Sequence, residues 1–580
     1  MNKNCLLAVA SLLLMSSSFA QNIGINADGS RPNSNAILDI KSGTKGLLIP
    51  RMDSLARNAI PNTKGLLVYD ISTDKFWYNT GKGWECIPND KDRGKGGDAW
   101  LLKGNGNTTD TGSFLGTTNN VPLNIRVNNQ PSGRIDSASG STFWGYHTGG
   151  NYSRINSDNT AIGQQSLNHN TGGFANTGVG FQTLYSNTTG TDNTAVGIQA
   201  LLNNVNGFSN TATGTYALYY NTSGYENTAN GFSALNENQA GLYNTADGAY
   251  ALFSNNYGNY NVAVGSSAML LTTSGSGNTA IGGNALRQNT TGELNTVLGY
   301  QTMYFNTIGT NNTATGTQSL EANTSGSYNA AHGFQALSGN TSGSYNTADG
   351  ELSMLSNLSG SSNTAIGAGT MWQNNTGNNN TAIGFQANVS TDGLSNATAI
   401  GNGAIVDASN KVRIGNSAVT VIEGQVPFTT PSDGRYKFNV EENVGGLDFI
   451  LHLRPVTYQF DVRRFDAQMQ HQPVNGAGNY ALQAGYDEAT RIRRSGFIAQ
   501  EVEKAANDAG YDFSGIIRPK TEQDHYSLSY DAFVVPLVKA VQEQQQIIRQ
   551  QNKRLEEQDK KLTALQAQLD DIKKLLQPAN

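Results

Sequence analysis

The sequence predicts a mainly β protein in which a parallel β-solenoid (a β-roll) of 17-residue repeats is followed by a small α+β domain and a C-terminal coiled coil. Three observations carry this prediction. Glycines recur at a fixed spacing of 17 residues between residues 163 and 401, which is typical of a solenoid. The nearly uncharged composition changes to an ordinary globular one near residue 432. Apolar residues then recur every seven positions from Val534 to Leu576, as in a coiled coil.

Residues 1–20 have the pattern of a secretory signal peptide, with Lys3 near the start, an apolar run and small residues before Gln21. We therefore expect an exported protein, extracellular or on the cell surface of a bacterium. Loss of the signal peptide removes Cys5 and leaves Cys86 without a cysteine to pair with in the mature chain, so no intrachain disulfide is expected. No other apolar stretch is long enough to be a transmembrane segment.

Residues 21–90 predict an N-terminal β module, because apolar and polar residues alternate between glycine-containing turns. The stretch resembles N-terminal modules of secreted fibre-like proteins. Its aromatic residues either stack on a surface glycan or form the core of the module, and core packing is the more common use of aromatics in hairpins. These residues are Trp77, Tyr78 and Trp84.

Residues 151–405 are the predicted solenoid, and residues 91–150 before it are expected to be a linker and a transitional β segment. Fifteen glycines are separated by fourteen intervals of 17 residues without an insertion. Seventeen residues are too few for a helical hairpin, whereas a T-A-I/V segment followed by Gly and a turn such as NTSG suits a short strand and a tight turn. Coils stacked about 4.8 Å apart make a rod on the order of 70 Å long.

Two further positions repeat in each coil. Asn stands four residues before the glycine in fourteen of the fifteen coils, and an apolar residue stands four residues after it in fourteen, the exception being Asn388. The glycine lets neighbouring coils approach closely, while Asn either adopts a left-handed backbone or caps the turn with its side-chain amide. The many N-x-S/T triplets of the coils are interpreted as turn chemistry rather than as glycosylation sites.

The residue immediately before each glycine follows a second period of six coils, or 102 residues. Three coils with Ile, Val or Leu at this position alternate with three polar coils. The polar residues are Thr213, Asn230, Asp247, Thr315, His332 and Asp349. The preceding position is almost always Ala, and alternation along a strand turns the two positions to opposite faces. The polar residues of the variable face either meet water or form polar layers or an ion site at a symmetry axis.

The distribution of charge excludes a nucleic-acid partner. The formal net charge is −6, no lysine occurs between Lys103 and Lys411, and residues 151–401 contain two arginines against ten acidic residues. A nucleic-acid-binding surface needs a basic track. No cofactor and no metal site are expected, since isolated His and Asp residues rarely bind a metal ion without further donors.

The C-terminal part divides into a β neck over residues 406–431, a globular domain over 432–533 and the coiled coil over 534–577. The domain contains, in order, the motifs SDGRYK, LRPVTY, GFIAQEV and YSLSYDA. In the coiled coil, the seam that complements the heptad residues has Gln in three of six layers, namely Gln544, Gln551 and Gln558. Polar layers reduce the stability of a coiled coil but fix its register and its number of strands.

The order of the four motifs resembles the intramolecular chaperone autoprocessing domain of endosialidases, phage tail spikes and related fibres, over about residues 432–550. The NTAIG coils are similar to the head repeats of trimeric autotransporter adhesins, whose heads are left-handed parallel β-rolls assembled as trimers. Together the resemblances imply a homotrimer. The first also implies that the C-terminal domain trimerises the fibre and then cuts itself off.

This resemblance assigns the cut to Ser432 and Lys437 of the SDGRYK motif. A neutral lysine in a desolvated site can take the proton of a serine hydroxyl, and a positive charge from Arg435 would favour the neutral lysine. The expected step is attack by the Ser432 hydroxyl on the carbonyl of Pro431, giving an ester that water resolves. Each chain is cut once, between Pro431 and Ser432.

The same motif departs from the family pattern at two positions, Pro431 and Tyr436, and proline restricts the backbone at the expected scissile bond. The alternative suggested by spacing alone is a simple turn. In that case Ser432 or Asp433 caps the backbone and Lys437 is solvated.

Two functions remain open at the level of sequence. The first is a secreted or cell-surface trimeric fibre, adhesin-like, whose C-terminal domain directs assembly and cleaves itself off as a single-turnover serine endopeptidase with no external substrate. The second is an uncleaved structural or glycan-binding surface fibre with a permanent trimerisation cap. A surface glycan or a host or cell-surface receptor is a possible partner of either. A glycan-cleaving tail spike is disfavoured, because the coils show no recognisable pair of catalytic carboxylates.

Overall fold

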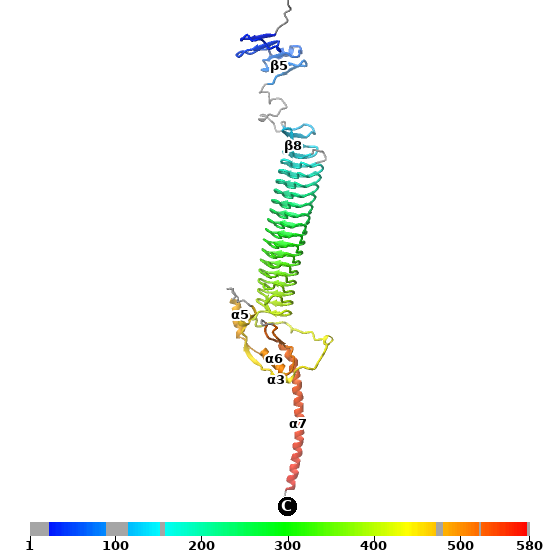
Figure 1. Ribbon diagram of the computed structural model, residues 1–580, viewed down its shortest axis with the longest axis vertical. Coiled ribbons are helices and arrows are strands. Elements are labelled where there is room, and N and C mark those ends of the chain that lie inside the picture. The colour runs from blue at the N-terminus through cyan, green and yellow to red at the C-terminus, as the bar shows by residue number, and fades with distance from the viewer. Residues whose placement is uncertain (1–21, 89–113, 151–156, 471–479, 521–523, 577–580) are drawn as a thin grey trace, which may run out of the picture. The chain divides into compact units, whose positions relative to one another are not determined.

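The computed structural model describes residues 22–88, 114–150, 157–470, 480–520 and 524–576. The chain divides into two compact units, residues 1–118 and residues 119–580 (Figure 1). The expected signal peptide and much of the expected linker lie outside the described residues. In the part of the chain that is described, no helix is both long and apolar enough to cross a membrane.

Within residues 22–88, the N-terminal unit has two small sheets and one short helix. Strands β1 and β2 form a parallel pair, and β3 to β6 form a four-stranded sheet in which only β3 and β4 are parallel. The carboxylate of Asp53 accepts the N–H of Ala56 and thereby begins α2. In chain order the elements are β1 (Ile23–Asn26), β2 (Leu38–Lys41), β3 (Arg51–Met52), α2 (Ser54–Ala59), β4 (Leu67–Asp70), β5 (Lys75–Asn79) and β6 (Trp84–Cys86).

A buried ion pair joins α2 to this sheet. Arg57 is 5% exposed, and its Nε lies 3.3 Å from a carboxylate oxygen of Asp70. The guanidinium carbon lies 3.5 Å from the ring centre of Trp77, a cation–π contact that covers one face of that ring. Trp77 is therefore used for packing inside the unit, whereas Tyr78 is exposed and donates a hydrogen bond to Glu85 at 2.8 Å.

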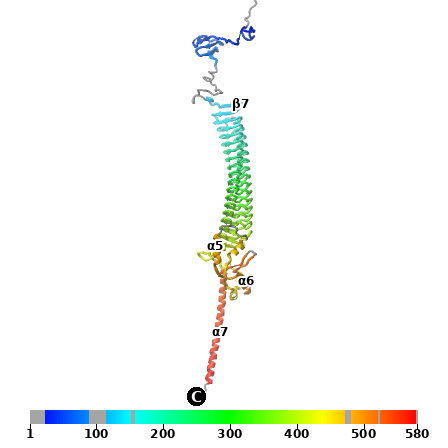
Figure 2. The same ribbon diagram turned by 90° about the vertical axis from the view of Figure 1, so that its left-hand side faces the viewer.

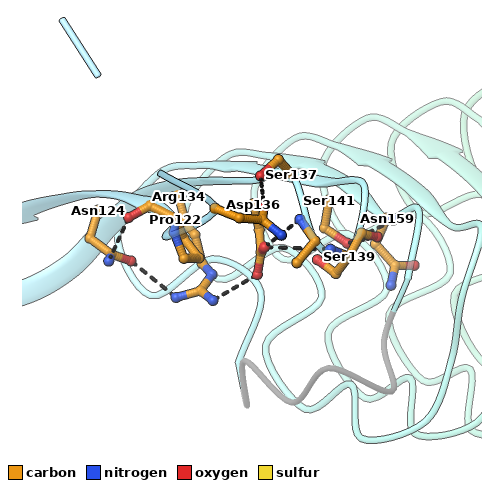
Figure 3. Close-up of polar contacts among 10 residues, drawn as sticks. Pro122, Asn124, Arg134, Asp136, Ser137, Ser139, Ser141 and Asn159 are labelled. Atoms are coloured by element: carbon orange, nitrogen blue, oxygen red, sulfur yellow. Dashed lines mark hydrogen bonds and ion pairs between the residues drawn. The ribbon is translucent and has the colours of Figure 1, made fainter. Parts of the chain in front are cut away.

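The second unit begins with an antiparallel meander that pairs with the first coil of the solenoid. Its strands are β7 (Leu123–Val127), β8 (Gln130–Asp136) and β9 (Ser141–Trp144), and β9 pairs in parallel with β10. The buried carboxylate of Asp136 accepts Arg134 Nη2 at 2.7 Å, and Arg134 Nη1 donates to Asn124 at 3.1 Å (Figure 3). Burial by itself would raise the pKa of Asp136, but its hydrogen bonds, that from Arg134 above all, hold the pKa below its ordinary value.

The predicted parallel β-solenoid is confirmed. Each coil contributes one three-residue strand that pairs in parallel, without a shift, with the strand 17 residues further on, for example Ala195 with Ala212 (Figures 1 and 2). The strands are β10 (Thr160–Ile162), β11 (Thr177–Val179), β12 (Thr194–Val196), β13 (Thr211–Thr213), β14 (Thr228–Asn230), β15 (Thr245–Asp247), β16 (Val262–Val264), β17 (Thr279–Ile281), β18 (Thr296–Leu298), β19 (Thr313–Thr315), β20 (Ala330–His332), β21 (Thr347–Asp349), β22 (Thr364–Ile366), β23 (Thr381–Ile383) and β25 (Thr398–Ile400). At the end of the stack, β27 (Val412–Ile414) pairs with β25, and β24 (Asn388–Val389) pairs with β26 (Ile405–Val406).

The inside of the coil is filled by the two apolar positions that the repeat predicts. The Ala of each strand and the Leu or Met four residues after the glycine have no accessible surface in nearly every coil. Leu201, one of these anchors, has a φ of 53°, a left-handed conformation that an L-residue with a branched side chain adopts only when its surroundings stabilise it. Gly197 has a φ of 130°, and a β-carbon there would lie 2.6 Å from the carbonyl oxygen of Gly214 in the next coil. The coils thus touch backbone to backbone.

Asparagine side chains form a buried ladder along the solenoid. The side-chain oxygen of Asn193 accepts the backbone N–H of Asn210 at 3.0 Å, and its amide donates to the carbonyl of Gly207 at 2.9 Å. The two alternatives for this asparagine are thereby resolved: it caps with its amide, and the left-handed residue is the one before it, for example Asp192 with a φ of 58°.

A second ladder, which the repeat analysis treated only as a turn, is built by the Asn of the NTSG-type turns. Asn187 donates to the side-chain oxygen of Asn170 at 2.9 Å and to the carbonyl of Gly190 at 3.0 Å. Asn187, within an N-x-S/T triplet, is fully buried. Its amide therefore serves the turn, as the sequence interpretation proposed.

After the solenoid, the chain forms the predicted small α+β region. Its core joins Phe449, Val502, Ala505, Ala506, Phe513, Ile516 and Phe533. Strand β28 pairs antiparallel with β29, and β30 with β31. The elements are the 3-10 turn η1 (Gly434–Tyr436), α3 (Leu447–His452), β28 (Val456–Gln459), α4 (Val462–Gln470), α5 (Tyr480–Arg491), β29 (Arg493–Gly496), α6 (Ala499–Asp508), β30 (Ile516–Ile517), β31 (Ser527–Leu528), the 3-10 turn η2 (Tyr530–Phe533) and α7 (Val534–Leu575).

The last element, α7, is a single helix of 42 residues (Figure 2). Its heptad side chains lie on the surface of the single chain, among them Val541, Leu555 and Leu562. A stripe of exposed apolar side chains does not stabilise an isolated helix, whereas a coiled coil buries the stripe between its helices. The helix agrees with the heptad region, and its partner helices remain a prediction.

Candidate functional site

The candidate site lies where the chain leaves the solenoid and enters the α+β region. Ser432 and Lys437 flank η1, in an exposed stretch between β27 and α3. The short turn forms because the side chain of Asp433 accepts the backbone N–H of Arg435 at 2.9 Å. This turn folds the chain back on itself and brings the two ends of the motif together.

The fold places the expected serine and lysine in direct contact. Lys437 Nζ donates a hydrogen bond to Ser432 Oγ at 2.8 Å, which is the separation that a base and a nucleophile need for proton transfer. Both residues are exposed in the single chain. The desolvation that favours a neutral lysine is therefore not supplied by the described residues of one chain.

The structure assigns the backbone cap to Asp433, one of the two residues that the simple-turn alternative named, while Ser432 turns to Lys437. Arg435, which we expected to place its positive charge near the lysine, instead pairs with Asp433. Its Nη2 and Nε lie 2.5 and 2.9 Å from the same carboxylate oxygen. Hydrogen bonds from the Arg435 side chain and backbone hold the pKa of Asp433 below its ordinary value.

His452 and His525, two histidines of the domain, each contact a residue other than Ser432. His452 Nδ1 lies 2.8 Å from the carbonyl oxygen of Asp448, one turn back in α3. His525 Nδ1 lies 3.2 Å from a carboxylate oxygen of Asp407, and its ring packs edge-on against Phe465.

The contact between Asp407 and His525 belongs to a cluster that sequence reasoning missed. The Asp407 side chain is 5% exposed and also lies 2.7 Å from Lys411 Nζ. Burial by itself would raise the pKa of Asp407, but bonds from His525 and Lys411 outweigh it and hold the pKa well below its ordinary value. The guanidinium of Arg413 lies 5.6 Å from the Phe465 ring. The cluster fastens the last coil to the α+β region.

Three of the four sequence motifs contact one another in this region. Arg454 of LRPVTY pairs with Glu501 of GFIAQEV, with Nε and Oε2 3.0 Å apart. The Tyr530 hydroxyl of YSLSYDA accepts the N–H of Phe497 at 3.0 Å, and Phe497 stacks on Phe533 with ring centres 5.2 Å apart. The motifs therefore describe one packed unit that leads directly into α7.

Comparison with protein families gives matches at both ends of the chain. Residues 432–511 match the chaperone of endosialidase, so the resemblance drawn from the motifs is confirmed, and the match begins at Ser432. Residues 24–105 match the phage tail like trimerisation region, an assignment that the alternation of strands and turns did not suggest. A comparison with curated proteins gives no match. The chain is thus similar to the chaperone of endosialidase over residues 432–511 and to phage tail like trimerisation regions over residues 24–105, with the β-solenoid between them.

Proposed function

We propose that the protein is an exported trimeric fibre whose C-terminal domain directs assembly and then cuts the chain once, between Pro431 and Ser432. The observation that carries the cut is the 2.8 Å contact between Lys437 Nζ and Ser432 Oγ at the first residue of the chaperone match. The trimerisation match, the chaperone match and the β-solenoid together fit a trimeric fibre-like protein.

In the proposed reaction a neutral Lys437 takes the hydroxyl proton of Ser432 as Oγ attacks the carbonyl carbon of Pro431. The peptide C–N bond then breaks, and the lysine ammonium returns the proton to the nitrogen of Ser432, which becomes a free amine. The product is an ester between the Pro431 carbonyl and Ser432 Oγ. Water hydrolyses it to a carboxylate on Pro431 and a free Ser432 hydroxyl.

Assembly is proposed to switch this reaction on. Ser432 and Lys437 are exposed in one chain, where water stabilises the ammonium form of the lysine. Contact with neighbouring copies in a trimer would remove that water and favour the neutral base. The cut would therefore follow trimer formation, and the fibre would be released with its chains already aligned.

The test is the size of the chains in purified full-length protein, measured by denaturing gel and intact mass. We expect fragments that begin at residues 21 and 432, and their loss in Ser432→Ala. Lys437→Arg should also abolish the cut, since a guanidinium does not release its proton at physiological pH. Thr430→Ala, an exposed neighbour, is the matched control and should be cut normally.

The second candidate is a fibre that stays intact, with the C-terminal domain as a permanent trimerisation cap. The observations that favour it are Pro431, which restricts the backbone at the scissile bond, and the exposure of Lys437. If wild type and Ser432→Ala are both intact while native mass gives a trimer, this second function replaces the first. Attachment to a surface glycan or receptor, in the role of an adhesin, is proposed for either form.

A further inference from the structure

Tyrosine side chains stand on one corner of the solenoid in two neighbouring pairs. We call this corner the corner row, meaning the residue five positions before the repeating glycine in each of the fifteen coils. Four of its members are tyrosines. The rings of Tyr243 and Tyr260 are stacked with their centres 4.9 Å apart and their planes 6° apart, and those of Tyr328 and Tyr345 are stacked at 4.9 Å and 1°. Each pair therefore forms an aromatic stack that spans two consecutive coils.

The second ring of each stack is largely open to solvent. In the corner row Tyr260 is followed by Gly277 and Tyr345 by Ser362, so no third ring continues either stack. Tyr260 is accordingly 63% exposed and Tyr345 is 61% exposed. One face of each of these rings lies against the preceding tyrosine, so the exposed part includes the other face.

The fold does not need an aromatic ring at this corner. All fifteen members of the corner row have a left-handed backbone, with φ between 54° and 69°. Six of them are Asp, Asn or Gly, which adopt this conformation at a lower cost than a bulky side chain does. Tyr260 has a φ of 57° and Tyr345 has a φ of 60°. A costly residue at a position that smaller residues fill in other coils indicates a role outside the fold.

The charges around the two exposed rings restrict the kind of ligand. The turns that carry them, residues 254–262 and 338–347, contain no charged residue, and Arg287 is the only Lys or Arg between residues 155 and 410. An anionic polymer needs a cationic surface. A cationic peptide would find no carboxylate in these turns to pair with. The corner therefore fits an uncharged ligand.

A neutral sugar matches the chemistry of this corner. The oxygens of a pyranose leave its ring C–H groups with partial positive charge, and the face of an aromatic ring is negative and attracts them. The residue immediately before each exposed ring is polar. Asn259 Oδ1 accepts the backbone N–H of Leu242 at 2.8 Å, and Ser344 Oγ accepts that of Ser327 at 3.0 Å. The side-chain hydrogens of Asn259 and Ser344 are donors for sugar hydroxyl groups.

We propose that Tyr260 and Tyr345 are two platforms on which the pyranose rings of a neutral glycan stack. The inference rests on the attachment role proposed above and gives that role a site and a class of ligand. The platforms lie five coils apart, about 24 Å along the solenoid. A polysaccharide chain contacts both, whereas a short oligosaccharide contacts one. Simultaneous contact strengthens binding, because the second platform is met at a high effective concentration.

The test is affinity electrophoresis of the purified full chain in native gels that contain a polysaccharide. The neutral panel is hydroxyethyl cellulose, arabinoxylan, galactomannan, laminarin, dextran and yeast mannan, and the anionic controls are heparin and polygalacturonate. We expect at least one neutral polysaccharide to retard the protein and neither anionic polymer to do so. A trisaccharide of the same sugar should compete only at a much higher concentration, because it reaches one platform.

The deciding variants are Tyr260→Ser and Tyr345→Ser. Ser362 has the same place in its coil and a φ of 58°, so the coil accepts serine at this position. We expect each variant to weaken binding by about tenfold or more and the double variant to abolish the retardation. Tyr260→Phe keeps the ring and should bind like the wild type. Tyr300→Ser is the matched control, since Tyr300 is exposed but lies outside the corner row.

Four results overturn the inference. They are no retardation by any neutral polysaccharide, retardation by the anionic polymers instead, undiminished binding of the double variant, and an equal loss of binding in Tyr300→Ser. In each case a trimer by native mass and a fragment that begins at residue 432 leave the proposed fibre and its cut standing. A monomer by native mass overturns the proposed function, whatever the gels show.

Discussion

The buried asparagines show what a single side chain contributes to the solenoid. Asn227 accepts the backbone N–H of Asn244 at 3.0 Å and donates to the carbonyl of Gly241 at 2.8 Å. Both bonds lie inside the coil, where no water replaces them. Each asparagine therefore joins its own coil to the next, and the loss of one asparagine interrupts the ladder at that coil.

Replacing one asparagine of the ladder should leave buried hydrogen-bonding groups without a partner. We expect Asn227→Ala to destabilise the protein by about 2 to 4 kcal/mol, because a buried N–H and a buried carbonyl lose their partner. Thermal denaturation followed by circular dichroism measures the effect. Asn206→Ala is the control, since Asn206 is exposed and its loss should change the midpoint little. Equal midpoints for the two variants would contradict the role of the ladder.

Asp407 predicts a dependence on acid at the same scale. Its pKa is held below the ordinary value of 3.8, so its carboxylate stabilises the fold at any pH above that value and loses this effect as the pH falls below it. We expect Asp407→Asn to reduce stability at pH 7 by about 2 to 4 kcal/mol and by clearly less near pH 2, because the stabilisation declines steadily as the pH falls below 3.8. The control is Asp512→Asn, at an exposed position. A difference that is the same at both pH values would refute the assignment.

Among the elements, the strands of the solenoid were predictable in detail and the turns only in part. A three-residue strand repeats with the glycine, and alternation within it decides which residue is buried, so both followed from spacing. The second ladder, that of Asn187 and its equivalents, was not foreseen, because a turn residue and a buried ladder residue have the same sequence pattern.

In the candidate site, too, some contacts could be predicted from the sequence and others could not. The contact of Ser432 with Lys437 was expected from the family resemblance, whereas spacing alone suggested a turn with a solvated lysine. The partner of Arg435 was not, because spacing cannot distinguish a charge that faces a lysine from one that faces Asp433. The contact of Asp407 with His525 joins residues far apart in the chain. A contact between residues so far apart leaves no short motif in the sequence from which it could be predicted.

Helix α7 makes a prediction about polar layers. Replacing Gln551 by Leu should raise the thermal stability of the assembled helices, because an apolar side chain in the seam is buried at no polar cost. It should also admit assemblies other than the trimer, since a polar layer that fixes the number of strands is lost. Native mass and thermal denaturation measure the two effects. Gln550→Leu, just outside the seam, should alter neither. A trimer of unchanged stability would show that residue 551 does not face a partner helix.

The backbone contact between coils at Gly197 and its equivalents sets a rule for how such a fibre changes length. Because each coil meets the next without a side chain between them and every strand pairs in register, a gain or loss of a few residues would dislocate the stack. Between β10 and β25, where every coil has 17 residues, a whole turn of 17 residues is the unit that can be added or removed with the contacts unchanged, and each turn changes the rod by about 4.8 Å. The number of coils, and with it the length of the rod, can therefore be counted from the sequence. The solenoids of natural variants should differ from this one by a whole number of coils, and most readily by six.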